Sequence, residues 1–157
     1  MIEIFIISFI ILVVDIISKR LVINYMFYDM SVNIIDGFFR ITYARNMGIA
    51  FSILDGHVDF IVLMTIAVLV MIYKYIKSNV SSKCDKISYA FIIGGAIGNL
   101  IDRIFYGYVV DFLDFNIFGY NFPIFNLADT FIVIGVFVLI VNGFREDGGK
   151  NEVNSRR

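Results

Sequence analysis

Four long apolar stretches constrain the fold of this 157-residue chain more than any other feature. A helix that crosses a bilayer needs roughly 20 mostly apolar residues, and each stretch has about that length. The stretches run from about Ile4 to Phe27, Val58 to Ile76, Ile87 to Tyr106 and Phe125 to Phe144. None contains an interior proline. We therefore predict an all-α membrane protein of four transmembrane helices, with one domain over residues 1–144.

The composition agrees with a membrane protein and narrows the classes of function. Hydrophobic residues make up 59% of the chain and charged residues 17%, whereas soluble domains are about 45–50% apolar and about 25% charged. The single cysteine, Cys84, excludes an internal disulfide, and the single histidine, His57, argues against a zinc or haem site. We expect no metal, no organic cofactor and no nucleic-acid partner. We also expect the first apolar stretch to be a retained helix and not a cleaved signal peptide.

The distribution of lysine and arginine predicts how the chain is oriented in the membrane. Basic residues gather between the second and third stretches and in the C-terminal tail: Lys74, Lys77, Lys83 and Lys86, then Arg145, Lys150, Arg156 and Arg157. Short loops rich in lysine and arginine stay in the cytoplasm. We therefore place both termini in the cytoplasm and expect residues 145–157 to be a polar, disordered tail.

The two connections on the opposite side are long and aromatic. Residues 38–44 are rich in strand-forming types, which predicts a short strand or hairpin within the 28–57 connection. Residues 107–124 are rich in Phe, Tyr and Gly, and aromatic residues favour the headgroup region of a membrane. We expect 28–57 and 107–124 to form one small extracytoplasmic cap that contains a short β-sheet.

Polar residues near the outer ends of three predicted helices form a further constraint. A helix rises about 1.5 Å per residue, so these residues reach similar depths: Asp15, Lys19, Asn99, Asp102, Arg103, Asn126 and Asp129. Lys19 follows Asp15 by four positions, which predicts a self-neutralising pair. Gly94, Gly95 and Gly98 predict close helix packing, with room for a substrate backbone as the alternative.

Asp111 and Asp129 are the candidate pair for acid–base chemistry. Two carboxylates a few ångströms apart cannot easily both ionise, so they share one proton. One of them can then take a proton from water while the other polarises a carbonyl group. The alternative is that Asp111 is a solvated loop residue and Asp129 a charge favoured by a helix N-terminus.

The remaining polar residues have less certain roles. Asp102 is an alternative catalytic carboxylate, although the adjacent Arg103 favours a structural ion pair. Asp114 is expected on the solvated side of the cap. Asn46 either orients a substrate backbone or belongs to a turn. Other classes of function also remain open, namely a channel or transporter subunit with a proton path and a non-catalytic assembly factor. A proton path would need polar residues in the inner halves of the helices, which are almost purely apolar.

Five blocks of residues, in this order and spacing, resemble the lipoprotein signal peptidase family, also called signal peptidase II. The blocks are Asp15-x-x-Ser18-Lys19, Arg45-Asn46-x-Gly48-x-Ala50-Phe51, GGAIGNLIDR at 94–103, VVDF at 109–112 and FPIFNLAD at 122–129. The resemblance extends from about Asp15 to Gly135. Two positions depart from the family's pattern, Ile16 where glutamine is frequent and Thr130 where serine is frequent.

The resemblance implies an aspartic endopeptidase of the bacterial cytoplasmic membrane, with its active site at the outer leaflet. Its substrates would be diacylglyceryl-modified prolipoproteins, cut on the N-terminal side of the lipobox cysteine. Membrane lipids and cyclic peptide inhibitors of the globomycin type would be its other ligands, and it would act as a monomer without metal or cofactor. Asp111 and Asp129 match the family's catalytic pair. The supporting positions that the resemblance implies are Asp15, Lys19, Asn46, Gly48, Asn99, Asp102, Arg103, Asn126 and Ala128.

Overall fold

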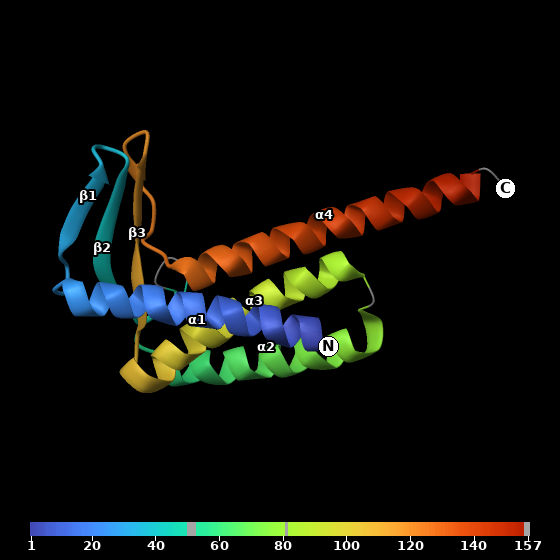
Figure 1. Ribbon diagram of the computed structural model, residues 1–157, viewed down its shortest axis with the longest axis horizontal. Helices are drawn as coiled ribbons and strands as arrows, with labels where there is room; N and C mark the ends of the chain where they lie inside the picture. The colour runs from blue at the N-terminus through green and yellow to red at the C-terminus, as the bar shows by residue number, and fades with distance from the viewer. Residues whose placement is uncertain (50–52, 81, 156–157) are drawn as a thin grey trace.

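Four helices and a small sheet make up the fold. The computed structural model describes residues 1–49, 53–80 and 82–155, the last ten of them by their backbone only. The helices are α1 (Ile2–Tyr25), α2 (Val58–Asn79), α3 (Lys83–Tyr106) and α4 (Leu127–Ser155). Figure 1 shows the helices along the length of the molecule, the sheet across one end, and the N-terminus and the end of α4 away from the sheet. The four predicted helical stretches are confirmed.

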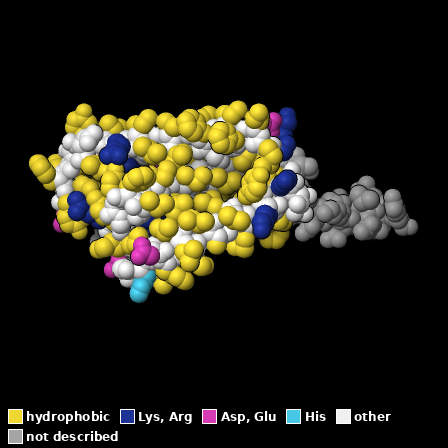
Figure 2. All heavy atoms as spheres, turned by 90° about the horizontal axis from the view of Figure 1, so that it is seen from below, with side chains coloured by type: hydrophobic (Ala, Val, Ile, Leu, Met, Phe, Trp, Pro, Cys, Tyr) yellow, Lys and Arg dark blue, Asp and Glu magenta, His cyan; other side chains and the backbone are white. Residues whose placement is uncertain are grey.

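Within the described residues, three helices are long and apolar enough to cross a membrane: α2, α3 and the segment Leu127–Arg145 of α4. Helix α1 has 24 residues but carries Asp15, Lys19 and Arg20 close together. The space-filling view shows hydrophobic side chains over the helical part of the surface (Figure 2). That surface is what a lipid-facing helical body requires, and the crossing of α1 itself stays a prediction.

Glycines on α3 allow its neighbours to approach closely, as the sequence predicted. A Cβ atom on Gly94 would lie 2.8 Å from the carbonyl oxygen of Ser8 on α1. A Cβ atom on Gly95 would overlap the carbonyl oxygen of Ala128 on α4, and one on Gly98 would overlap the carboxylate of Asp15. Since lipid offers no hydrophobic force between helices, such close contact is what holds them together.

The polar tail was predicted to be disordered, and this prediction differs from the structure. Helix α4 continues to Ser155, well beyond the predicted end of the apolar stretch at Phe144. Extending a helix adds one hydrogen bond per residue without a new nucleation cost. The Arg, Glu and Lys residues of this segment are also good helix formers.

The sheet joins the two long connections, which confirms the predicted short sheet, whereas its extracytoplasmic position stays a prediction. Strands β1 (Ser31–Ile35) and β2 (Phe39–Asn46) come from the first connection, and β3 (Val109–Ile117) and β4 (Tyr120–Asn121) from the second. They pair antiparallel in the order β1-β2-β3-β4. A cluster of Val22, Tyr43, Val110 and Phe112 packs the sheet against the end of α1.

A bulge in β2 sets the positions of the acidic side chains on β3. Ile41 pairs with Leu113 and Ala44 with Asp111, so three steps on β2 match two steps on β3. An extra residue of this kind bends a strand and redirects its side chains. Most of β3 is buried, Asp111 and Asp114 included.

Candidate active site

The first turn of α4 fixes the position of Asp129. Asn126 precedes the helix, and its Oδ1 accepts a hydrogen bond from the backbone N–H of Asp129 at 3.0 Å. Asp129 Oδ2 in turn accepts the backbone N–H of Asn126 at 3.2 Å. This reciprocal arrangement is a capping box, which satisfies two N–H groups that the helix leaves unpaired. The remaining oxygen, Oδ1, accepts the side-chain amide of Asn99 at 2.7 Å.

Asp111 approaches the same place from β3. Its side chain is only 2% exposed, and both of its oxygens accept hydrogen bonds from amides. Asn126 Nδ2 donates to Oδ1 at 2.7 Å and Asn46 Nδ2 donates to Oδ2 at 2.9 Å. Asn126 therefore contacts both candidate carboxylates, one through its side-chain amide and one through its capping bonds.

The two carboxylates interact electrostatically. The pKa of Asp111 is raised to about 7, first by burial and then by the negative charge of Asp129, and the hydrogen bonds from Asn46 and Asn126 lower it only in part. A carboxyl group in this state carries a proton over much of the range below neutral pH. The structure thus brings the predicted pair together and favours a proton on Asp111.

A buried charge cluster orients the amides. Lys19 Nζ forms ion pairs with Asp15 at 2.8 Å and with Asp102 at 3.1 Å, and it donates to Asn99 Oδ1 at 2.9 Å. Because Oδ1 of Asn99 also accepts from Asn126 at 3.1 Å, the amide nitrogen of Asn99 faces Asp129. The predicted Asp15–Lys19 pair is confirmed, and polar groups of three helices meet at one depth.

The predicted ion pair between Asp102 and Arg103 is wrong. Adjacent residues on a helix point about 100° apart, and the two side chains turn to different partners. Asp102 pairs with Lys19 and accepts the backbone N–H of Val110 at 3.1 Å. Arg103 donates to the carbonyl oxygens of Asn99 at 3.4 Å and Gly48 at 2.6 Å. Asp102 therefore ties α1 to β3, and Arg103 holds the segment after β2.

Asp114 is not on a solvated surface, contrary to the prediction. Its side chain is buried and accepts from Thr42 at 2.7 Å and from Arg40 at 2.9 Å, with a second ion-pair contact to Arg40 at 2.8 Å. Arg40 pairs directly with Asp114 across the two strands, next to the bulge that follows Ile41. Asp114 thus links β3 to β2.

Asn46 has the turn role that the sequence left open for it, and the orientation of a substrate backbone by Asn46 stays a prediction. Its Oδ1 accepts the backbone N–H of Gly48 at 3.0 Å, which forms a tight turn, while its amide holds Asp111. Ala128 is fully buried and donates its backbone N–H to Asp15 at 3.0 Å. Ala50 and Phe51 of the same sequence block lie outside the described residues.

Sequence reasoning missed one feature beside the site. The guanidinium of Arg45 lies over the rings of Tyr28, Tyr43 and Tyr108, at 4.9, 5.5 and 4.8 Å from their centroids. These tyrosines are far apart in the sequence, so only the pairing of the strands reveals the cluster. Among the described residues, no three His, Cys, Asp or Glu side chains are grouped to hold a metal ion.

Comparisons with known proteins point to one family. The family described as Signal peptidase (SPase) II matches residues 7–145. A lipoprotein signal peptidase of Serratia proteamaculans is 39% identical over 150 residues, 90% of this chain and 86% of that protein. One from Staphylococcus haemolyticus is 39% identical over 92% of this chain and 92% of that protein. One from Francisella tularensis subsp. novicida is 42% identical over 87% of this chain and 88% of that protein.

Solved structures agree in fold. A bacterial membrane enzyme determined at 2.3 Å resolution superimposes with a TM-score of 0.88 and 34% identity, over 94% of this chain and 90% of that one. A second bacterial membrane enzyme gives a TM-score of 0.81 and 35% identity, over 88% of this chain and 90% of that one.

Proposed function

Because this chain belongs to the signal peptidase II family of lipoprotein signal peptidases, we propose that Asp111 and Asp129 are the catalytic pair of an aspartic endopeptidase. Membership of the family supports cleavage of lipoprotein signal peptides. The observation that carries the proposal is the buried Asp111, with a pKa of about 7 beside the charge of Asp129. The amides of Asn99 and Asn126 hold both carboxylates toward the same place.

In the proposed mechanism the pair activates one water molecule. Asp129 takes a proton from the water while the oxygen of that water attacks the scissile carbonyl carbon. Protonated Asp111 donates a hydrogen bond to the carbonyl oxygen. The tetrahedral intermediate then collapses and the C–N bond breaks. The proton taken by Asp129 passes to the departing amine, so Asp129 is ionised again and ready for the next water.

The position of the pair suits a substrate anchored in lipid. Asp129 lies in the first turn of α4, and Asp111 lies on β3, which begins just after the end of α3. We place this end at the outer leaflet, with both termini in the cytoplasm, because the lysine-bearing segments 74–80 and 82–86 lie at the other end. A diacylglyceryl-modified cysteine could keep its acyl chains in the bilayer there while the peptide bond on its N-terminal side meets water.

The proposal is tested with one precursor in two forms, lipidated and unlipidated, and purified protein in detergent. We expect cleavage of the lipidated form alone, and mass spectrometry of the product should place the cut immediately before the modified cysteine. Equal cleavage of both forms would contradict the substrate class, and a cut elsewhere would contradict the cleavage site. A parallel reaction with EDTA should proceed at the same rate.

A further inference from the structure

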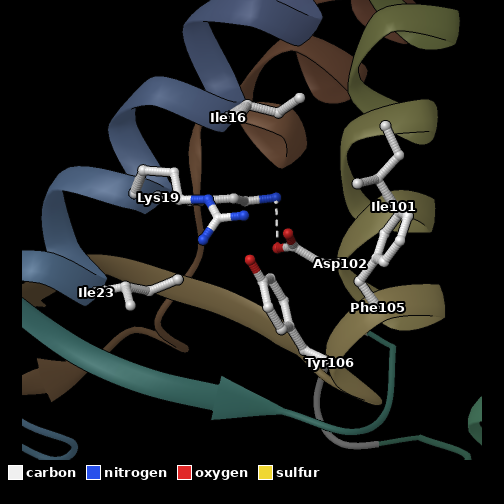
Figure 3. Close-up of a pocket in the computed structure, with 8 residues that line it drawn as sticks. Ile16, Lys19, Ile23, Ile101, Asp102, Phe105 and Tyr106 are labelled. Atoms are coloured by element: carbon white, nitrogen blue, oxygen red, sulfur yellow. Dashed lines mark ion pairs between the residues drawn. The ribbon is translucent and has the colours of Figure 1, made fainter.

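A groove of about 310 Å³ lies between α1 and α3. The Lys19–Asp102 ion pair lies in its wall, and Figure 3 shows the hydroxyl of Tyr106 pointing toward that pair. Arg20 also lines the groove, and its other walls are apolar: Ile16, Ile23, Ile101 and Phe105. This combination of apolar walls and a few polar groups is typical of a small-ligand site.

The charge of this groove comes from Arg20. Lys19 is fully buried and is shared between Asp15 at 2.8 Å and Asp102 at 3.1 Å, so this cluster adds no positive charge to the groove. Arg20 is exposed, and its guanidinium carbon lies 5.6 Å from the centroid of the Tyr106 ring. Within the described ranges no carboxylate pairs with Arg20. The groove therefore presents one cation that is available to an anion.

The polar and apolar groups of the groove follow one another along the helices in the same order as the headgroup and acyl chains of a phospholipid. Arg20 lies five residues before the end of α1, about 8 Å from that end by the rise of a helix, and Tyr106 is the last residue of α3. Arginine and tyrosine at such a depth place their polar ends in the headgroup region. Ile16 and Ile101 lie about one turn farther from the sheet, and Figure 3 shows them on facing helices.

We propose that this groove binds an anionic phospholipid of the leaflet on the side of the sheet. The lipid phosphate contacts Arg20 and the hydroxyl of Tyr106, and an acyl chain lies along Ile16, Ile101 and Phe105. The attraction of Arg20 for an acidic headgroup rests on the same electrostatics as that of basic pockets between helices on the cytoplasmic side of membranes. The site is distinct from the carboxylate pair, and the proposal does not depend on the catalytic mechanism.

The chain contains no tryptophan, so a single introduced tryptophan reports on the groove. Phe105→Trp would be studied in bilayers that contain a brominated lipid, either phosphatidylglycerol or phosphatidylcholine, because bromine quenches tryptophan at close range. At Phe105→Trp we expect phosphatidylglycerol to bind about fivefold more tightly than phosphatidylcholine. The matched control is Phe60→Trp, an exposed residue on the first turn of α2 at the same end of the molecule. There the ratio should be near one.

Arg20→Gln in the Phe105→Trp protein should return the ratio to near one. If that variant folds poorly, the same ratio in the Arg20-containing protein should fall as salt is raised, since salt screens an exposed charge. Equal quenching by the two lipids at Phe105→Trp would overturn the proposal. A preference for phosphatidylglycerol that survives both Arg20→Gln and high salt would overturn it as well.

Discussion

Amides, and not cations, hold the two candidate carboxylates. Asn46, Asn99 and Asn126 donate the side-chain hydrogen bonds to Asp111 and Asp129. The nearby cations make their direct contacts elsewhere, since Lys19 pairs with Asp15 and Asp102, and Arg103 donates to backbone carbonyls. They reach the two candidate carboxylates only through longer-range electrostatic attraction. An amide fixes a carboxylate in place without neutralising it. The pair can therefore keep a proton at a pH where ordinary carboxylates have lost theirs.

Stability should depend on pH through Asp111. The pKa of Asp111 is about 7 in the folded protein against an ordinary value of 3.8. Protonated Asp111 stabilises the folded protein fully below about pH 4. This stabilisation is lost as pH rises to about 7, because Asp111 loses its proton at a lower pH in the unfolded chain than in the folded protein. That loss amounts to as much as about 4 kcal/mol. The melting temperature of the wild type should therefore fall more between pH 5 and pH 8 than that of Asp111→Asn. Equal slopes for the two proteins would contradict the raised pKa.

The close contact between helices α3 and α4 positions the first turn of α4, which carries Asp129. Gly95→Ala would drive a Cβ atom into the carbonyl of Ala128, so we expect a loss of about 1–3 kcal/mol of stability. Gly143→Ala on α4 is the matched control, because a Cβ there meets nothing within 4 Å. Thermal unfolding of both variants checks this. A Gly95→Ala protein as stable as Gly143→Ala would show that the close approach is not needed.

The sequence predicted helices better than side-chain partners. Long apolar runs were enough to find the helices, and strand-forming residues were enough to find the short sheet. Asn126 contacts both Asp111 and Asp129, as expected of neighbours, but their catalytic role stays a prediction. The partners of Asp102 and Asp114 were missed for two physical reasons. Asp102 and Arg103 are neighbours in sequence but diverge around a helix, and Lys19, the actual partner of Asp102, comes from a separate helix. The partners of Asp114 come from the pairing of β2 with β3, which sets Arg40 opposite Asp114 although the two are far apart in the sequence.

The lysine-bearing segments 74–80 and 82–86, the N-terminus and the end of α4 lie away from the sheet (Figure 1). We expect that end to face the cytoplasm. In a Cys84→Ser background, Phe118→Cys at the tip of the sheet should react in spheroplasts with a membrane-impermeant maleimide. Ile2→Cys at the start of α1 should react only after lysis. Labelling of both in intact spheroplasts would contradict the crossing of α1.

The assignment of Asp111 and Asp129 as the catalytic pair is tested most directly by turnover per folded molecule. The variants are Asp111→Asn, Asp129→Asn and the double variant, with a diacylglyceryl-modified precursor as substrate. Each single variant should lose about 10²–10⁴-fold in turnover, and the double variant should lose little more, because the two carboxylates act as a unit. Asp102→Asn and Asp114→Asn should lose stability but keep measurable turnover, since their partners are structural. Robust turnover by folded Asp111→Asn, together with folded but inactive Asp102→Asn, would contradict the assignment of the catalytic pair.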